Sequence, residues 1–252
     1  MKTRTFLFPA FTAIMMISSV AFAPPHESLI TAADLLGKIN PARDSGFTLL
    51  GNRYCARSGH YLRNEAYLSF VKMYEAAAKD GIILTVLSST RTFSDQKTIW
   101  ENKWSGKTKV NGQDLSETIK DPSVRARAIM HYSSMPGTSR HHWGTEVDLV
   151  NLNKEYFDTP AGRKVYLWLH DHAHEFGFCQ PYTEKNEKRP DGYEEEKWHW
   201  SYMPLSAVFY SSYIEKISYS DITGFTGSAY AKDVRAIESY VKGINGECAG
   251  EK

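Results

Sequence analysis

The sequence predicts an α+β fold, and three observations support this assignment. Apolar residues recur at helical spacing over residues 62–79, a short run rich in β-branched residues follows at 82–88, and the later strand-like segments are separated by long polar loops. Helices first and strands later, broken by long loops, are typical of α+β domains. The 252 residues suffice for one mid-sized domain, or for one domain with a small appendage.

The first predicted elements follow a mixed segment at residues 30–60, which we expect to be irregular structure packed on the domain. A helix is predicted over residues 62–79, and Gly81 stands where a C-terminal cap belongs. Residues 82–88 are apolar, β-branched and followed by polar residues, which predicts a buried strand. The next predicted helix, residues 94–104, begins at a serine that can cap it. The apolar face of the first helix is formed by Tyr67, Phe70, Val71 and Tyr74.

The rest of the chain alternates between loops and short elements. Polar, charged or Pro- and Gly-containing stretches predict loops, and these lie at residues 105–122, 133–143 and 184–193. The predicted regular elements are, in chain order, a helix at 122–130, a strand at 145–149, a helix at 160–177, a short aromatic segment at 198–202 and an amphipathic helix at 228–244.

Composition and charge exclude some classes of function. Hydrophobic residues make up 42% and charged residues 23% of the chain, which is ordinary for a soluble globular protein. The formal net charge is +1, so we expect no electrostatic binding to nucleic acid. Internal repeats and low-complexity linkers are absent from the sequence, which argues against a wall-anchored structural protein.

The first 23 residues have the pattern of an export signal. Lys2 and Arg4 form a short positive region, and residues 6–20 are apolar and uncharged. Small residues then predict cleavage after Ala21 or Ala23. We therefore expect a periplasmic or extracellular protein without a stable membrane span in its mature form.

Three cysteines are present, so in an oxidising compartment two can pair and one remain free. Their wide spacing is unlike a zinc ribbon. Cys179 follows Gly177 and Phe178 at a helix end and has the character of a buried apolar position. The favoured pairing is therefore Cys55 with Cys248.

Two short segments carry the chemistry, residues 139–148 and 196–200. His141 and Asp148 are seven residues apart with Gly144 between them, so a turn there can bring the imidazole beside the carboxylate. If residues 145–149 form a strand, Glu146 and Asp148 project from the same face. A histidine and carboxylates in one place favour a cation.

The second segment supplies a third ligand and a base. Glu196 and His199 are three residues apart, so one tight turn places both side chains on the same side. A catalytic zinc needs three protein ligands and one open position for water, and we expect His141, Asp148 and His199 to hold one zinc per chain. Glu196 is then the general base, because zinc lowers the pKa of the water and a nearby carboxylate accepts its proton.

Together the segments resemble the signature of the zinc D-alanyl-D-alanine carboxypeptidases and dipeptidases, which include the vancomycin-resistance enzymes and share a superfamily with lysostaphin-type peptidases and hedgehog domains. That signature is S-x-H-x-x-G-x-A-x-D followed by E-x-W-H. One departure is Glu146, where a small residue is more usual. The matching residues are Ser139, His141, Gly144, Asp148, Glu196, Trp198 and His199.

A third segment, residues 88–96, is similar to the S-x-x-R-S-x-x-x-Q region of that family. The resemblance implies that Arg91 stabilises the oxyanion, which a fixed guanidinium can do, and that Gln96 supports the site. It also implies substrate contacts from Ser139, Gln96 and Trp198, and a small antiparallel sheet with flanking helices around a single zinc site. His170, His172 and His174 are better explained as a polar helix surface.

The resemblance implies a zinc carboxypeptidase acting on short peptides, in particular the D-Ala-D-Ala termini of peptidoglycan stem peptides. The alternatives are a cell-wall endopeptidase and a non-catalytic zinc-binding domain of the hedgehog kind. A base at Glu196 together with Arg91 favours catalysis. The expected organisation is a signal peptide at 1–23, a packed N-terminal segment at 24–61, the zinc peptidase domain at 62–215 and a C-terminal helical extension at 216–252.

Overall fold

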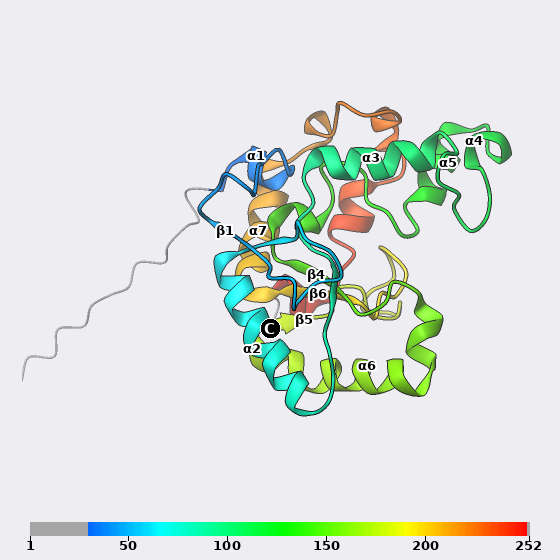
Figure 1. The fold of residues 1–252 in the computed structure, drawn as a ribbon. Coiled ribbons are helices and arrows are strands. Elements are labelled where there is room, and N and C mark those ends of the chain that lie inside the picture. Colours follow the sequence, from blue (N-terminus) through cyan, green and yellow to red (C-terminus); the bar gives the residue numbers. More distant parts are fainter. Residues whose placement is uncertain (1–29, 251–252) are drawn as a thin grey trace, which may run out of the picture.

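A computed structural model of the chain describes residues 30–250. The predicted leader and its cleavage positions lie outside the described residues. Helices and small antiparallel sheets are mixed along the chain (Figure 1), so the predicted α+β fold is confirmed. Within the described range, no helix combines the length and the apolar character needed to cross a membrane.

The centre of the molecule is a four-stranded sheet in the order β3-β4-β6-β5, with all neighbouring strands antiparallel. A separate antiparallel pair joins β1 (Phe47–Leu49) to β2 (Tyr61–Arg63). The strands of the central sheet are β3 (Val86–Ser88), β4 (Glu146–Leu149), β5 (Phe178–Cys179) and β6 (His199–Tyr202).

Alternation along β4 and β6 sorts apolar and polar side chains onto opposite faces of this sheet. Val147 pairs with Trp200, and both belong to the hydrophobic core beneath the sheet. The neighbouring pairs are Asp148 with His199 and Glu146 with Ser201. Because successive side chains of a strand point to opposite faces, these four polar residues share the face that points away from that core.

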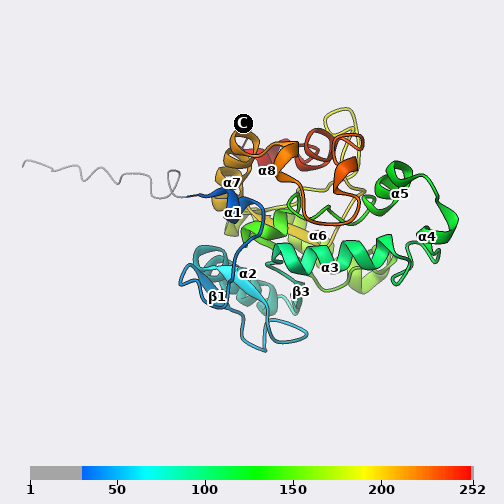
Figure 2. The same cartoon turned by 90° about the horizontal axis from the view of Figure 1, so that it is seen from above.

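Helices cover both faces of the sheet. One core lies between the sheet, α2 (Asn64–Lys79) and α6 (Pro160–His172). A second core joins α3 (Phe93–Trp104), α7 (Met203–Lys216) and the C-terminal segment on the other side (Figure 1). Seen from above, α3 leads away from the sheet towards the short helices at the far end of the molecule (Figure 2). The remaining α-helices are α1 (Ala32–Leu35), α4 (Leu115–Thr118), α5 (Pro122–Ile129) and α8 (Gly246–Ala249).

Several predicted elements are confirmed with small changes of boundary. The first long helix begins at Asn64, and the cap of α3 is Thr92, which forms a capping box with Asp95. In the predicted strand at 82–88 only the last three residues pair with a neighbour, although Ile82 and Leu84 are buried. The strand before α3 is therefore shorter than the apolar segment, residues 82–88, that predicted it.

One prediction for the C-terminal part is wrong, and one helix there was not predicted. The segment 228–244 is not one helix, because Arg235 adopts a left-handed conformation (φ 54°) and a six-residue π-helix, Ala236–Val241, follows it. The segment between the sheet and residue 217 is the long helix α7, which the pattern did not indicate. Its buried face includes Ser206 and Ser212 beside the aromatic residues, so no apolar period is visible in the sequence.

The predicted pairing of Cys55 with Cys248 is also wrong, because Cys248 is bonded to Cys179. Cys179 lies on the edge strand β5 and Cys248 on α8, and their Cα atoms are 5.8 Å apart. Cys55 is a free thiol in the core beneath the sheet, and burial raises its pKa. The bridge ties the C-terminal segment to the edge of the sheet.

Loss of this bridge is expected to lower the free energy of unfolding by about 2–4 kcal/mol, because it closes a loop between residues 69 positions apart. The variant Cys179→Ser/Cys248→Ser should show this in denaturant unfolding under oxidising conditions. A reductant should lower the stability of the wild type to that of the variant and leave the variant unchanged. Equal stability of the two oxidised proteins would contradict the pairing.

Candidate functional site

A cleft of about 980 Å³ opens on the polar face of the central sheet. Its lining combines the loop after β3, the loop before β4, and the residues at the start of β6. The residues of the predicted site that line it are Arg91, Ser139, His141, Asp148, Glu196, Trp198 and His199. The structure therefore gathers segments that lie more than 100 residues apart in the sequence.

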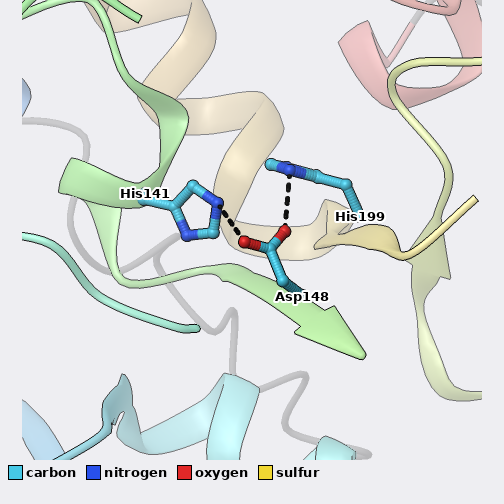
Figure 3. Close-up of side chains that lie close together, drawn as sticks. All are labelled: His141, Asp148 and His199. Atoms are coloured by element: carbon cyan, nitrogen blue, oxygen red, sulfur yellow. Dashed lines mark ion pairs between the residues drawn. The ribbon is translucent and has the colours of Figure 1, made fainter. Parts of the chain in front are cut away.

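Two histidines flank one aspartate at the floor of the cleft (Figure 3). Asp148 Oδ2 is 3.3 Å from His141 Nε2, and Asp148 Oδ1 is 3.2 Å from His199 Nδ1. All three residues are buried, and one ligand atom from each lies within 4.8 Å of the others. These are the three residues that the sequence predicts as metal ligands, and the strand pairing of Asp148 with His199 brings two of them together.

His141 reaches the same place from a short 3₁₀ helix, Arg140–Trp143, which ends at Gly144 in the left-handed region (φ 76°). A side chain at this glycine is excluded, because a Cβ there would lie 2.5 Å from the ring of Phe47. His141 Nδ1 contacts the carbonyl of Ser89 at 2.7 Å. That hydrogen bond leaves Nε2 directed towards Asp148.

The donor atoms fit a single divalent metal ion. His141 Nε2 and Asp148 Oδ1 are buried and have no hydrogen-bond partner among the described residues. A buried polar atom without a partner costs free energy, which a cation between these atoms removes. The two nitrogen–oxygen separations of 3.2–3.3 Å, each to one oxygen of Asp148, are close to the spacing of about 3.4 Å between ligand atoms of a tetrahedral zinc with bonds near 2.1 Å.

His199 is held from both sides. Its Nε2 is 2.8 Å from Glu146 Oε2, and its Nδ1 faces Asp148 and Glu196. Burial alone lowers the pKa of His199, but the neighbouring carboxylates of Asp148, Glu146 and Glu196 outweigh burial and raise the pKa well above its usual range. A metal must displace the proton that this histidine holds, so metal binding weakens as the pH falls.

Glu196 lies beside these three residues. Its Oε2 is 3.3 Å from His199 Nδ1, and the residue is 7% exposed. The backbone is fixed because Glu196 N donates to the carbonyl of Tyr182, and Gln180 Nε2 donates to the Glu196 carbonyl. Burial raises the pKa of the Glu196 carboxyl, although His199 acts in the opposite direction. A carboxylate with a raised pKa is a stronger base than an exposed one.

Arg91 lines the cleft from the loop after β3. Its Nη1 donates to Gln96 Oε1 at 2.9 Å, and its Nη2 is 4.0 Å from Asp148 Oδ2. Gln96 is fully buried and donates to the carbonyl of Ser134. Gln96 thus fixes the guanidinium from behind and is not among the residues that line the cleft, whereas Arg91 is.

Ser139 and Trp198 lie in the lining of the cleft. Ser139 is 1% exposed, and its Oγ has no hydrogen-bond partner within the described part of the chain. Trp198 is 8% exposed and packs near Phe157, with ring centroids 6.4 Å apart. Both are therefore in reach of a molecule in the cleft, whereas Gln96 acts through Arg91.

The sequence patterns did not assign three other residues of the site. Lys103 lines the cleft and hydrogen-bonds to Ser133 Oγ, and its place seven residues after Gln96 on a helix was a usable signal. His60 also lines the cleft and has a buried Nε2 without a hydrogen-bond partner in residues 30–250, but no motif marks it. Glu146 contacts His199, and its position two residues before Asp148 on a strand was the signal.

Two histidines, an aspartate and an adjacent buried glutamate at the floor of a cleft are typical of mononuclear metal-dependent hydrolases. The comparison with known families is consistent with this class. Residues 59–205 match the VanY family model, described as D-alanyl-D-alanine carboxypeptidase, and the chain belongs to this family.

Two curated relatives are each similar to part of the chain. YodJ of Bacillus subtilis, which carries a carboxypeptidase name, is 30% identical over 154 residues, covering 59% of this chain and 48% of YodJ. A D-alanyl-D-alanine carboxypeptidase of Enterococcus faecalis is 27% identical over 158 residues, covering 63% of this chain and 51% of the relative. The chain thus spans about half the length of the curated relatives it matches.

Solved structures also resemble the chain. The vancomycin-resistance D,D-pentapeptidase VanY in complex with Zn(II) has a TM-score of 0.49 and 22% identity, covering 76% of this chain and 92% of that one. VanYB in complex with D-alanine-D-alanine has a TM-score of 0.47 and 23% identity, covering 71% and 93%.

Proposed function

We propose that the protein is a zinc-dependent carboxypeptidase that hydrolyses short peptides, with the D-Ala-D-Ala termini of peptidoglycan stem peptides as its substrates. Membership of the VanY family and the name of the Enterococcus faecalis relative support the substrate class. The observation that carries the chemistry is the buried His/Asp/His set with Glu196 at its edge.

His141, Asp148 and His199 would hold the zinc ion. When bound, the metal supplies Lewis-acid polarisation of a carbonyl and lowers the pKa of water. Glu196 takes the proton from the attacking water as the new C–O bond forms. It then delivers this proton to the amine nitrogen as the C–N bond breaks, so the products are a free carboxylate and a free amine.

Arg91 donates to the substrate oxygen that gains negative charge in the tetrahedral intermediate. The hydrogen bond from Arg91 to Gln96 supports this role because it fixes the guanidinium before substrate arrives. Ser139 offers a hydroxyl, and Trp198 an apolar surface, to the peptide in the cleft. A zinc site without catalysis needs neither Glu196 nor Arg91.

Export belongs to the same proposal. Stem peptides lie outside the cytoplasmic membrane, and the positive and apolar pattern of residues 1–23 is that of a leader. We also propose that residues 62–215 form the peptidase domain, with residues 24–61 and 216–252 as supporting segments.

Three substrates distinguish this function from its alternatives. A stem pentapeptide ending in D-Ala-D-Ala, the same peptide with an amidated C-terminus, and a cross-linked muropeptide dimer are incubated with zinc-loaded protein and analysed by mass spectrometry. The expected result is loss of one terminal residue from the first substrate only. Cleavage inside the cross-link would identify an endopeptidase, and three intact substrates would contradict a peptidase acting on these peptides.

Replacing Arg91 by alanine is expected to lower turnover by about 10²–10³-fold and to leave the zinc content unchanged. The reason is that Arg91 contacts the ligand Asp148 only at 4.0 Å and is not itself a ligand. Arg57→Ala is the matched control, since it removes another positive charge from the lining of the same cleft. An equal loss of turnover in both variants would show that the positive charge of the cleft, and not a hydrogen-bond donor fixed at Arg91, supports catalysis.

A further inference from the structure

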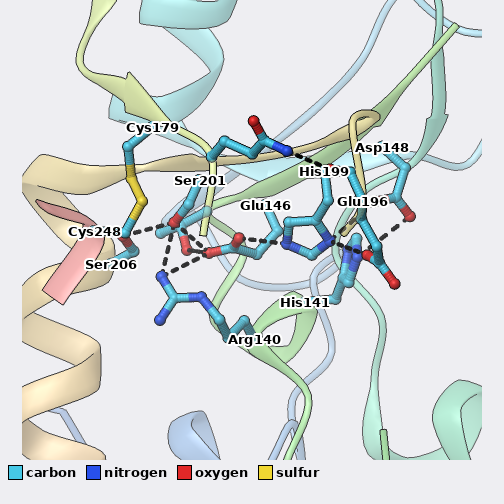
Figure 4. A network of polar contacts seen from close by, with 12 residues as sticks. Arg140, His141, Glu146, Asp148, Cys179, Glu196, His199, Ser201, Ser206 and Cys248 are labelled. Atoms are coloured by element: carbon cyan, nitrogen blue, oxygen red, sulfur yellow. Dashed lines mark hydrogen bonds and ion pairs between the residues drawn. A yellow bond between two sulfur atoms is a disulfide. The ribbon is translucent and has the colours of Figure 1, made fainter. Parts of the chain in front are cut away.

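A fully buried acidic residue stands behind the metal ligands (Figure 4). Glu146 is 0% exposed, and its Oε2 is 2.8 Å from His199 Nε2. Its other oxygen, Oε1, accepts hydrogen bonds from Ser201 Oγ at 2.7 Å and from Thr145 Oγ1 at 3.0 Å. Both oxygens therefore have hydrogen-bond partners, and the partner of Oε2 is the imidazole of His199.

The charge of this carboxylate is balanced by one arginine. Arg140 Nη2 is 3.4 Å from Glu146 Oε1 and 2.8 Å from Ser201 Oγ, and the side chain is 1% exposed. Two other nitrogens of Arg140, Nε and Nη1, are buried without a partner among the described residues. A buried ion pair with unsatisfied nitrogens is costly, and a well-packed apolar pair is often as stable or more so. Stability alone therefore does not explain the pair.

The geometry points to a role on His199, and we propose that Glu146 is a positioning residue that fixes the ring of His199 so that Nδ1 binds the metal. This proposal rests on the zinc site of the proposed function. Because Nε2 is taken by Glu146, Nδ1 is the nitrogen left to face Asp148, at 3.2 Å.

The two histidines thus enter the site differently. His141 is held through Nδ1 by the neutral carbonyl of Ser89 and presents Nε2. His199 is held through Nε2 by a carboxylate and presents Nδ1. A carboxylate that accepts the ring N–H of a metal-binding histidine fixes its tautomer and raises the basicity of the other nitrogen. Glu146 therefore strengthens metal binding by His199.

Zinc affinity of the metal-free protein tests this role. Glu146→Gln keeps the size of the side chain and removes its charge, and the expected result is a zinc affinity lower by about 10–100-fold in competition with a chromophoric chelator. Cobalt(II) substituted into the same variant should show a shifted visible absorption spectrum. Ser206→Ala is the matched control, because Ser206 contacts Ser201 in the same network but not His199; its affinity and spectrum should equal those of the wild type.

The single variant leaves Arg140 uncompensated, so a second variant protects the test against misfolding. Arg140→Met/Glu146→Gln removes the buried pair together and should fold, with the same loss of zinc affinity. Wild-type affinity and an unchanged cobalt spectrum in both variants would overturn the proposal. Peptidase activity is not a readout of this test. A wild-type protein that binds zinc but cleaves no stem peptide would refute only the proposed substrate. A wild-type protein that binds no zinc would refute both the proposed function and the role of Glu146.

Discussion

Replacing Glu196 by glutamine is expected to lower the rate of peptide hydrolysis by about 10²–10⁴-fold, the usual contribution of a general base. The fold and the zinc content should not change. The carboxylate stands 3.3 Å from the inward nitrogen of His199, beside the three ligands and not among them. Glutamine has the same shape and cannot accept a proton, so only proton transfer is removed.

The measurement pairs turnover on a D-Ala-D-Ala peptide with elemental analysis of the same sample. Glu195→Gln is the matched control, because this neighbour pairs with Lys197 and does not line the cleft. We expect it to retain turnover. If Glu196→Gln kept turnover near that of the wild type, another group would be the base. If it lost zinc, Glu196 would be a ligand.

Replacing His199 by alanine is expected to abolish both zinc binding and turnover. His199 supplies one of three buried ligand atoms, and a catalytic zinc site with two protein ligands left does not hold the metal firmly. The variant also leaves Asp148 and Glu146 without their shared partner, so one buried carboxylate loses a hydrogen bond and the other loses an ion pair. The loss of turnover should therefore exceed the loss caused by Glu196→Gln.

Zinc content after gel filtration and circular dichroism of the same sample separate loss of metal from loss of fold. Asp148→Asn should also lose zinc. His170→Ala is the control, because His170 lies on the surface of α6, where it pairs with Asp171 and is not part of the cleft lining. A folded His199→Ala protein with one zinc per chain would show that the metal is held elsewhere.

Local patterns in the sequence predicted the elements that bear the site. The spacing of apolar residues and the capping residues predict α2 and α5 to within a few residues at their ends. The alternation of side chains predicts β4. The spacing around Gly144 predicted that His141 and Asp148 meet, because the turn is local. Their meeting with His199 was expected from the need of zinc for a third ligand and from the family resemblance, and not from local spacing, since the pairing of β4 with β6 joins residues about 50 positions apart.

Features set by tertiary packing could not be predicted in the same way. The pairing of Cys179 with Cys248 depends on the packing of α8 against α7, and neither cysteine has a local signal for it. The left-handed Arg235 breaks a segment whose apolar period is helical, and the buried serines of α7 hide a real helix. Glu146 was visible as a departure from the family signature, but its partner Ser201 became evident only from the sheet register, and its partner Arg140 only from the packing of the preceding 3₁₀ helix.

The central claim is that a single zinc ion, held by His141, Asp148 and His199, supports removal of a terminal residue from a peptide. The most direct test is D-alanine release from a stem pentapeptide, measured on one preparation before chelation, after chelation, and after addition of one equivalent of zinc. The account predicts release, then no release, then release restored by one zinc per chain. Undiminished release from the metal-free protein would contradict it.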